Sequence, residues 1–232
     1  MMSERARDGC NFFPLVVDFE MKYYASGKIK GSRFMKREGR ASDQAILCAR
    51  MIDRPIRPMF PKNTRNEVQI ICTLLQTDGE RSPAMVGINA SSIACQLAGM
   101  PMDDAIGAVR VGMKEDGSLY VDPSYDEADN GRLDLLIAGT EDAITMVESG
   151  SDLLTNEEMI KALEFAHAEV KKICKAQKEF VSQFDIETKD LVLAENNPLA
   201  EELVAKHVSE ADFASITGTT KKEVKGHMHA LE

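Results

Sequence analysis

Two pairs of short apolar runs, each pair joined by a polar turn, occupy the middle of the 232-residue chain. The first pair, residues 106–113 and 118–122, flanks Glu115-Asp116-Gly117, and the second, residues 133–138 and 143–148, flanks Gly139-Thr140-Glu141-Asp142. A short apolar run bounded by turn residues is typical of a β-strand, and glycine permits the positive φ of a tight turn. The pattern predicts two β-hairpins, and so an antiparallel sheet at the centre of the fold.

Helical patterns lie on both sides of these hairpins. Ser42 is placed to cap a helix from about residue 43 to 53, which Pro55 closes. Thr155-Asn156-Glu157-Glu158 is a capping box, and the apolar stripe after it predicts a helix to about residue 181. Further expectations are an extended segment within residues 11–30, a strand over 67–76, a helix over 85–98 and helical structure around 199–214. Together they predict an α+β fold.

The composition is that of a water-soluble globular protein, with 44% hydrophobic and 28% charged residues. No apolar run approaches the roughly 20 residues of a membrane helix, and the first residues resemble neither a signal nor a transit peptide. We therefore expect no membrane partner and a cytoplasmic location. The five cysteines lack zinc-like or CxxC spacing and are expected to be reduced packing residues; they are Cys10, Cys48, Cys72, Cys95 and Cys174.

Positive charge is concentrated in one stretch of an otherwise acidic chain. The net charge of the whole chain is −10. Residues 28–65 contain eleven Lys and Arg against three Asp and Glu, a net charge of +8, which leaves −18 for the remainder. This asymmetry favours a local anion-binding surface on an acidic body.

The basic stretch has the residue types that contact single-stranded nucleic acid. Lys and Arg bind phosphate, and Phe34, beside Lys36 and Arg37, offers a stacking face to a base. A solvated run of charge is the alternative interpretation, and the residue types leave the two open.

Three arginines recur at intervals of four and three along the predicted helix and just past its end: Arg50, Arg54 and Arg57. This spacing places them on one side of the element. Arg54 and Arg57 have an equally open structural interpretation, in which they pair with Asp53, Glu38 or other carboxylates.

No catalytic motif of the common hydrolases or nucleotidases is present. Asp103-Asp104 is the best carboxylate pair for Mg²⁺, although a turn-capping role is favoured. The four histidines lie far from the basic stretch in sequence and predict no metal site: His167, His207, His227 and His229. We therefore predict no catalytic and no metal-binding residue from the residue pattern.

The segments KREGR, ARMIDRPIRPMFP, NEVQII, GAVRVG, LDLLIAGTEDAITMVES and LLTNEEM resemble polynucleotide phosphorylase, specifically its first RNase PH-type core. The resemblance covers about residues 8–182. It implies an α+β, RNase PH-like sheet of the ribosomal protein S5 domain 2-like type with packed helices. It also implies a partial first core over residues 1–150, incomplete at its N-terminal strands. An all-α segment over 151–232 then begins a linking helical domain.

The resemblance implies 3′-to-5′ phosphorolytic RNA degradation that releases nucleoside diphosphates, with Mg²⁺ and with inorganic phosphate as co-substrate. It implies single-stranded RNA, a homotrimeric ring and RNA-degradation complex components as partners. The positions matching the family's basic loop are Lys36, Arg37 and Arg40, and those matching its Arg-rich helix are Arg50, Arg54 and Arg57. With Phe34 they form the expected RNA-binding set.

The chain departs from the family pattern in three ways. Arg33-Phe34-Met35 precedes the basic pair with an apparent one-residue insertion, which weakens the expectation of stacking. The opening strands of the family's first core have no counterpart. The second core, which in the family supplies the catalytic acids and the phosphate pocket, is also absent. The equivalent region of this core, residues 99–104, lacks the Asp before the glycine and the Lys after the proline that mark an active core in the family.

Two hypotheses follow from the resemblance. In the first, the chain is the RNA-guiding part of a polyribonucleotide nucleotidyltransferase, inactive alone and completed by a second core in another polypeptide. In the second, it is a non-catalytic RNA-binding or ring-scaffold module, or a truncated gene fragment.

Under either binding hypothesis, the change of both Arg54 and Arg57 to Ala is expected to lower RNA affinity and flatten its salt dependence, because fewer counterions are released. RNA binding by the folded double variant across a salt series measures this. Unchanged affinity and slope would remove these two arginines from the RNA path.

Overall fold

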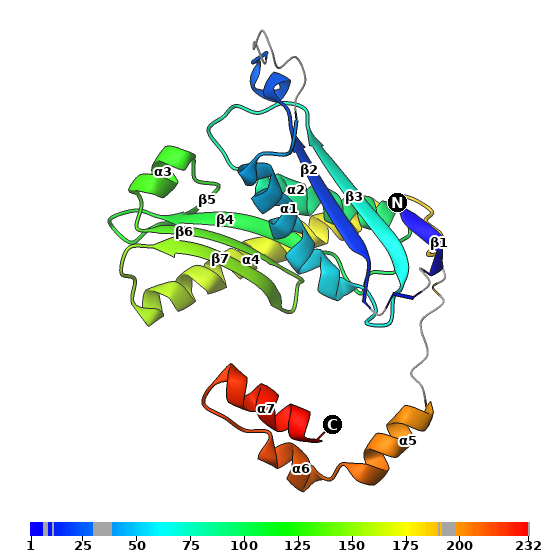
Figure 1. Cartoon of the computed structure of the whole chain (residues 1–232). Coiled ribbons are helices and arrows are strands. Elements are labelled where there is room, and N and C mark those ends of the chain that lie inside the picture. The colour runs from blue at the N-terminus through cyan, green and yellow to red at the C-terminus, as the bar shows by residue number, and fades with distance from the viewer. Residues whose placement is uncertain (7–8, 11, 30–38, 190, 192–197, 232) are drawn as a thin grey trace. The chain divides into compact units, whose positions relative to one another are not determined.

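A computed structural model describes residues 1–6, 9–10, 12–29, 39–189, 191 and 198–231 (Figure 1). Within these residues, seven strands form two sheets; they are β1 (Met2–Ala6), β2 (Leu15–Met21), β3 (Asn66–Leu74), β4 (Gly107–Met113), β5 (Leu119–Val121), β6 (Leu133–Gly139) and β7 (Ile144–Ser151). The α-helices are α1 (Asp43–Ile56), α2 (Ala84–Leu97), α3 (Tyr125–Asn130), α4 (Asn156–Val181), α5 (Pro198–His207), α6 (Glu210–Ser215) and α7 (Lys221–Leu231). Two short 3-10 helices cover Tyr23–Ser26 and Arg57–Met59. The predicted α+β class is confirmed.

The first sheet has the strand order β1-β3-β2. Strand β2 pairs with β3 in parallel, with Leu15 opposite Val68, whereas β1 pairs with β3 antiparallel and contacts only its first half. Figure 1 shows that β3 continues well past the N-terminus of the chain. Strand β2 and the second half of β3 therefore form open edges within the described part of this sheet.

The second sheet is antiparallel, in the order β5-β4-β6-β7. Gly117, at a φ of 82°, supplies the left-handed residue in the β4–β5 turn. Both predicted hairpins are confirmed, the second as β6–β7.

The two faces of this second sheet are both covered. Side chains alternate between faces along a strand, so Ala108 of β4 enters one hydrophobic cluster and the adjacent Val109 enters another. The first cluster also holds residues of α1, α2, β2 and β3; the second holds the inner stripe of α4. Helices α1 and α2 therefore lie between the sheets, and α4 covers the far face of the second sheet.

A buried polar triangle fixes α4 against α2 and the start of β4. The Ser92 hydroxyl donates to Gln177 Oε1 at 2.8 Å, and Gln177 Nε2 donates to the Ile106 carbonyl at 2.9 Å. The Ile106 N–H in turn donates to Ser92 Oγ at 2.9 Å. Ser92 and Gln177 are almost completely buried, so each of these polar groups needs its partner.

Pro55 does not end the first helix, contrary to the prediction that the helix stops near residue 53. Helix α1 runs to Ile56, and the N–H of Arg57 still donates to the Asp53 carbonyl. A proline in the last turn removes only one donor, and here its ring is buried in the core. The remaining bonds and this burial carry the helix past the proline.

Strand β1 and helices α3 and α7 were not predicted from the sequence. Strand β1 is short and polar, and α7 lies beyond the segment with a helical pattern. Helix α3 begins with a capping box formed by Ser124 and Glu127, which is a helix-start signal present in the sequence.

Cys48, Cys95 and Cys174 are buried free thiols, and burial raises the pKa of each to about 11.

The chain forms two compact units, residues 1–193 and residues 194–232. The division expected at residue 150 assigns α4 to the helical segment. In the structure α4 belongs to the first unit, because Val170 and Cys174 are completely buried in the cluster that it shares with β4 and β6.

Gly107→Ala is expected to destabilise the fold by about 1–3 kcal/mol, because overpacking at a fixed helix–sheet contact forces backbone shifts. An added Cβ would lie 2.9 Å from the Val170 carbonyl oxygen and 3.0 Å from Cys174 Sγ. Urea unfolding measures the loss. Gly150→Ala in β7 is the matched control, since nothing lies within 4 Å of its Cβ position. Equal stability of the two variants would refute the packing argument.

Candidate nucleic-acid interface

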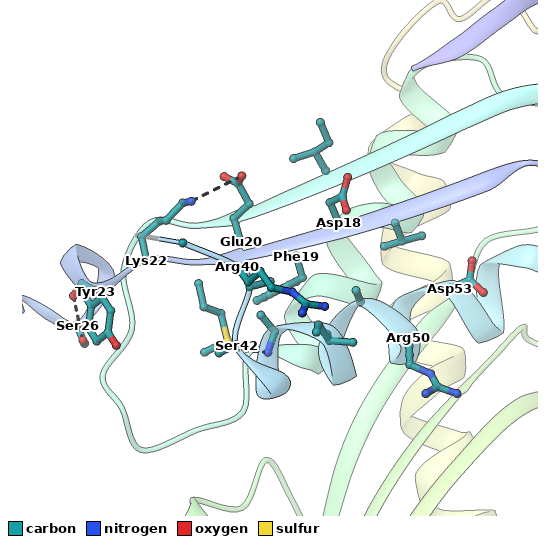
Figure 2. Close-up of a pocket in the computed structure, with 18 residues that line it drawn as sticks. Asp18, Phe19, Glu20, Lys22, Tyr23, Ser26, Arg40, Ser42, Arg50 and Asp53 are labelled. Atoms are coloured by element: carbon teal, nitrogen blue, oxygen red, sulfur yellow. Dashed lines mark hydrogen bonds and ion pairs between the residues drawn. The ribbon is translucent and has the colours of Figure 1, made fainter. Parts of the chain in front are cut away.

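A groove of about 750 Å³ lies between β2 and the first three turns of α1 (Figure 2). Its β2 wall is formed by residues 17–21, and its helical wall includes Ser42, Ala49 and Arg50. Asp18, Glu20 and Asp53 contribute carboxylates, and Lys22, Arg40 and Arg50 contribute cations. The groove is therefore of mixed charge.

The amphipathic pattern of α1 sets which of its side chains reach this groove. The Ser42 hydroxyl accepts from the Ala45 N–H at 3.2 Å and so begins the helix. Cys48 and Ile52 are buried against the core, which leaves Arg50 exposed at the groove. The predicted N-cap is confirmed. Because it sets where the helix begins, it also determines which side of α1 carries each arginine.

Arg40 and Arg50 are exposed, and neither makes an ion pair or side-chain hydrogen bond with any residue that the structure describes. Figure 2 shows the Arg40 guanidinium between β2 and the start of α1, and the Arg50 guanidinium extending from α1 on the side away from β2. Glu20 lies 3.8 Å from Lys22 Nζ. Uncommitted guanidinium groups at a groove are suited to bind phosphate oxygens.

Arg57 has a different role, because its guanidinium is held by four acceptors. It donates to both Asp53 carboxylate oxygens, at 2.6 and 3.0 Å, and to the carbonyls of Phe13 and Leu15, at 3.0 and 3.1 Å. It also lies 5.8 Å from the centroid of the Phe13 ring. Arg57 therefore ties the end of α1 to the start of β2.

Arg54 is also paired. Its Nη1 donates to Glu148 Oε2 of β7 at 2.7 Å, although both side chains are about half exposed. A pair this exposed contributes little stability, so its main effect is to reduce the local positive charge. The structure thus pairs Arg54 and Arg57, and leaves Arg40 and Arg50 available within the described residues.

Phe34, Lys36 and Arg37 lie outside the residues that the structure describes. Their expected contacts with RNA stay predictions. Arg40 follows them closely in sequence and lines the groove.

Within the Asp103-Asp104 pair, the Asp104 carboxylate is committed to structural contacts. Asp104 Oδ1 accepts from the Ala105 N–H at 2.7 Å and from Lys178 Nζ at 2.9 Å. Glu141 binds the same ammonium at 2.7 Å, and these two carboxylates raise the pKa of Lys178, with Glu141 the larger cause. The residues present therefore do not fit a Mg²⁺ site, because the cation position beside Asp104 is held by Lys178.

The described part of the chain contains no cluster of three or more His, Cys, Asp and Glu suited to a metal ion. His167 is half-buried, and its Nε2 lies 3.1 Å from the Thr140 carbonyl oxygen. Within the same residues, none of the helices has the length and apolarity to cross a bilayer.

Comparison with protein families gives two adjoining matches. Residues 2–101 match domain 1 of the 3′ exoribonuclease family, and residues 104–169 match domain 2 of that family. The chain belongs to the 3′ exoribonuclease family. The two RNase PH domains of this family correspond to the two layers described above, because the first match spans β1 to α2 and the second spans β4 to the middle of α4.

The curated relatives place this RNase PH core among the polyribonucleotide nucleotidyltransferases, as the first core of such a protein. The polyribonucleotide nucleotidyltransferase of Thermotoga maritima is 46% identical over 186 residues, which is 80% of this chain. That of Gloeobacter violaceus is 42% identical over 210 residues, or 90% of this chain. The chain spans 26% and 29% of the length of these relatives.

A solved structure supports the RNase PH fold. Rice (Oryza sativa) Rrp46 aligns with a TM-score of 0.56 and 15% sequence identity, covering 62% of this chain and 69% of that chain. At this identity the likeness concerns the fold alone.

The sequence suggested the Arg57–Asp53 pair, which is one helical turn apart, but it gave no sign of the carbonyl acceptors from Phe13 and Leu15. These groups lie more than forty positions away in the chain. Only the packing of β2 against α1 brings them within reach.

Arg57→Ala is expected to lower the free energy of unfolding by about 1–2 kcal/mol, because Asp53 and two carbonyls lose a charged donor at a half-exposed site. Arg50→Ala serves as the control and is expected to change it by less than about 0.5 kcal/mol. Urea unfolding of both variants measures the difference. A neutral Arg57→Ala change would remove the structural role assigned to this guanidinium.

Proposed function

We propose that this chain binds single-stranded RNA and guides its 3′ end in phosphorolytic degradation that releases nucleoside diphosphates. The activity is that of a polyribonucleotide nucleotidyltransferase, of which this chain supplies the first core. Its likeness to curated proteins of that name supports the reaction class.

The observation that carries the RNA-guiding role is the pair of uncommitted cations, Arg40 and Arg50, beside the groove between β2 and α1. Each is exposed, and within the described residues each lacks a carboxylate partner. Two guanidinium groups at one groove provide phosphate contacts that do not depend on base sequence. Phe34, Lys36 and Arg37 extend this surface in the proposal, with Phe34 as the stacking residue.

The same proposal assigns the chemistry to another core. Phosphorolysis needs positioned groups that stabilise charge on the phosphoryl oxygens, with Mg²⁺ and phosphate as the family's requirements. Asp104 of the expected Asp103-Asp104 pair binds Lys178 together with Glu141. We therefore place the Mg²⁺ and phosphate sites on a second core, and expect the residues of this first core to be inactive without it.

Assembly into a homotrimeric ring, with RNA-degradation complex components as further partners and a cytoplasmic location, belongs to the same proposal. A ring positions several RNA-guiding surfaces around one path, which raises the effective concentration of RNA at each of them.

A non-catalytic module that binds RNA or scaffolds a ring is the second candidate. The ion pair between Asp104 and Lys178 favours the non-catalytic module for the chain in isolation. The two candidates differ in whether a separately supplied second core restores turnover.

The test combines two measurements on the same folded sample. Release of ADP from poly(A) is followed with phosphate and Mg²⁺, and binding of a single-stranded oligoadenylate is followed across a salt series. Salt-sensitive binding, with ADP release only after addition of a second core, supports the enzymatic proposal. Binding without release under both conditions supports the non-catalytic module. Absence of binding at low salt overturns both.

The combined change of Arg40 and Arg50 to Ala is expected to weaken oligoadenylate binding and to reduce the slope of log K against log salt by about 1.4, since each single-strand phosphate contact contributes about 0.7. The control changes Lys171 and Lys175 to Ala; both are exposed on α4 and remove the same charge. Equal effects of the two double variants would mean that net charge, and not the groove, governs binding.

A further inference from the structure

The groove between β2 and α1 contains large apolar side chains as well as cations. Tyr23, in the short 3-10 helix after β2, lines the groove and is 50% exposed. Ile46 lines it from α1 and is 41% exposed. An aromatic ring and an isoleucine beside cations in one groove favour a ligand that has apolar faces as well as negative charge. None of the residues that line the groove belongs to β1, so its walls do not depend on that strand.

The main chain around Tyr23 is held by hydrogen bonds. The Ser26 hydroxyl donates to the Tyr23 carbonyl at 3.1 Å. Gly27 ends the 3-10 helix at a φ of 70°, a conformation that glycine adopts without strain. The Thr77 N–H donates to the Ala25 carbonyl at 2.9 Å, which ties this turn to the chain just after β3. The ring therefore projects from a fixed turn, and a ligand that contacts it has only two side-chain torsions to order.

Figure 2 shows how these groups follow one another along the groove. Tyr23 and Ser26 lie at one end, beyond Lys22, and the Arg40 guanidinium lies between β2 and the start of α1. A strand that passes along the groove therefore meets a guanidinium group and an aromatic ring in succession. This is the combination with which proteins bind single-stranded nucleic acid, because phosphates and bases alternate along the strand.

Tyr24 differs from its neighbour in position and in little else. It lies in the same 3-10 helix and is 55% exposed, but it does not line the groove. The two tyrosines thus share residue type, element and exposure. A comparison of the two separates contact with a ligand in the groove from the general effect of a surface aromatic ring.

We propose that Tyr23 stacks on a base of the RNA strand whose phosphate binds Arg40, and that Ile46 packs against the same strand. The position accepts any base, because every base has an aromatic face, and it favours purines, because their ring area is larger. An acidic peptide would pair with Arg40 but has no flat ring to cover Tyr23. This inference rests on the RNA-guiding role proposed above and adds to it a residue that contacts the bases.

The test measures binding of a single-stranded oligoadenylate to the full chain and to its tyrosine variants at one low salt concentration. Tyr23→Ala is expected to weaken binding about fivefold to hundredfold, which corresponds to the loss of one base–aromatic stack. Tyr23→Phe keeps the ring and should keep most of the affinity. Tyr24→Ala is the matched control and should leave the affinity unchanged. Both side chains are half exposed, so neither change is expected to unfold the chain.

An oligomer with the same number of phosphates but with abasic sugars separates stacking from charge. Tyr23→Ala should not change the affinity for this abasic oligomer, because no base is present to stack. The combined change of Arg40 and Arg50 to Ala should weaken binding of both oligomers, because both carry the same phosphates.

Fluorine NMR of the chain labelled with fluorotyrosine reports the contact directly. The chain has four tyrosines, so few resonances need assignment, and Tyr23→Phe and Tyr24→Phe each remove one of them. Oligoadenylate should shift the Tyr23 resonance through the ring current of the stacked adenine and should leave the Tyr24 resonance in place. The abasic oligomer should shift neither.

Three results would overturn the inference. One is an equal loss of oligoadenylate affinity for Tyr23→Ala and Tyr24→Ala. Another is a loss of affinity for the abasic oligomer in Tyr23→Ala as large as that for oligoadenylate, which would give Tyr23 a role in the shape of the groove. The third is unchanged affinity of Tyr23→Ala where the Arg40 and Arg50 variant binds weakly, which would keep the RNA-guiding role without the stack. Absence of oligoadenylate binding by the unchanged chain would overturn both.

Discussion

The alternation of side chains along β4 is the constraint on which the rest of the first unit depends. Ala108 packs toward α1 and α2, and Val109 packs toward α4, so a single strand joins two hydrophobic clusters. Helices α1 and α2 also pack against β2 and β3 of the first sheet, whereas the buried stripe of α4 packs against the second sheet. The second sheet therefore supports both groups of helices, α1 with α2 on one face and α4 on the other. The position of the groove beside α1 depends on that packing.

The arginines on and after α1 show how one residue type serves two purposes within eight positions. Arg57 donates to the Phe13 and Leu15 carbonyls where β2 begins, and Asp53 holds its charge. Arg50, which faces the groove, lacks such acceptors in the described structure. The hydrogen-bond acceptors around each arginine, and not the spacing of the arginines in the sequence, determine that Arg57 is structural and that Arg50 is available.

Structural features that depend on residues close together in the sequence were predicted correctly. The two hairpins, the Ser42 cap and the Thr155 capping box all follow from turn chemistry and local hydrogen bonds. Contacts between distant segments were not accessible in this way. The pairing of Lys178 with both Asp104 and Glu141 depends on how sheets and helices pack, which no local pattern in the sequence encodes.

The triangle of Ser92, Ile106 and Gln177 has a consequence for how the first unit unfolds. If α4 slid by one turn along the sheet, its apolar stripe would still meet apolar residues, but the Ser92 hydroxyl hydrogen and the Ile106 carbonyl would lose Gln177 as their partner in a dry interior. Partial displacement of the helix therefore carries a penalty of its own, because buried polar groups lose their partners even where apolar contact is kept. This links the two clusters into one cooperative transition, in which α4 is either fully docked or lost together with the layer beneath it.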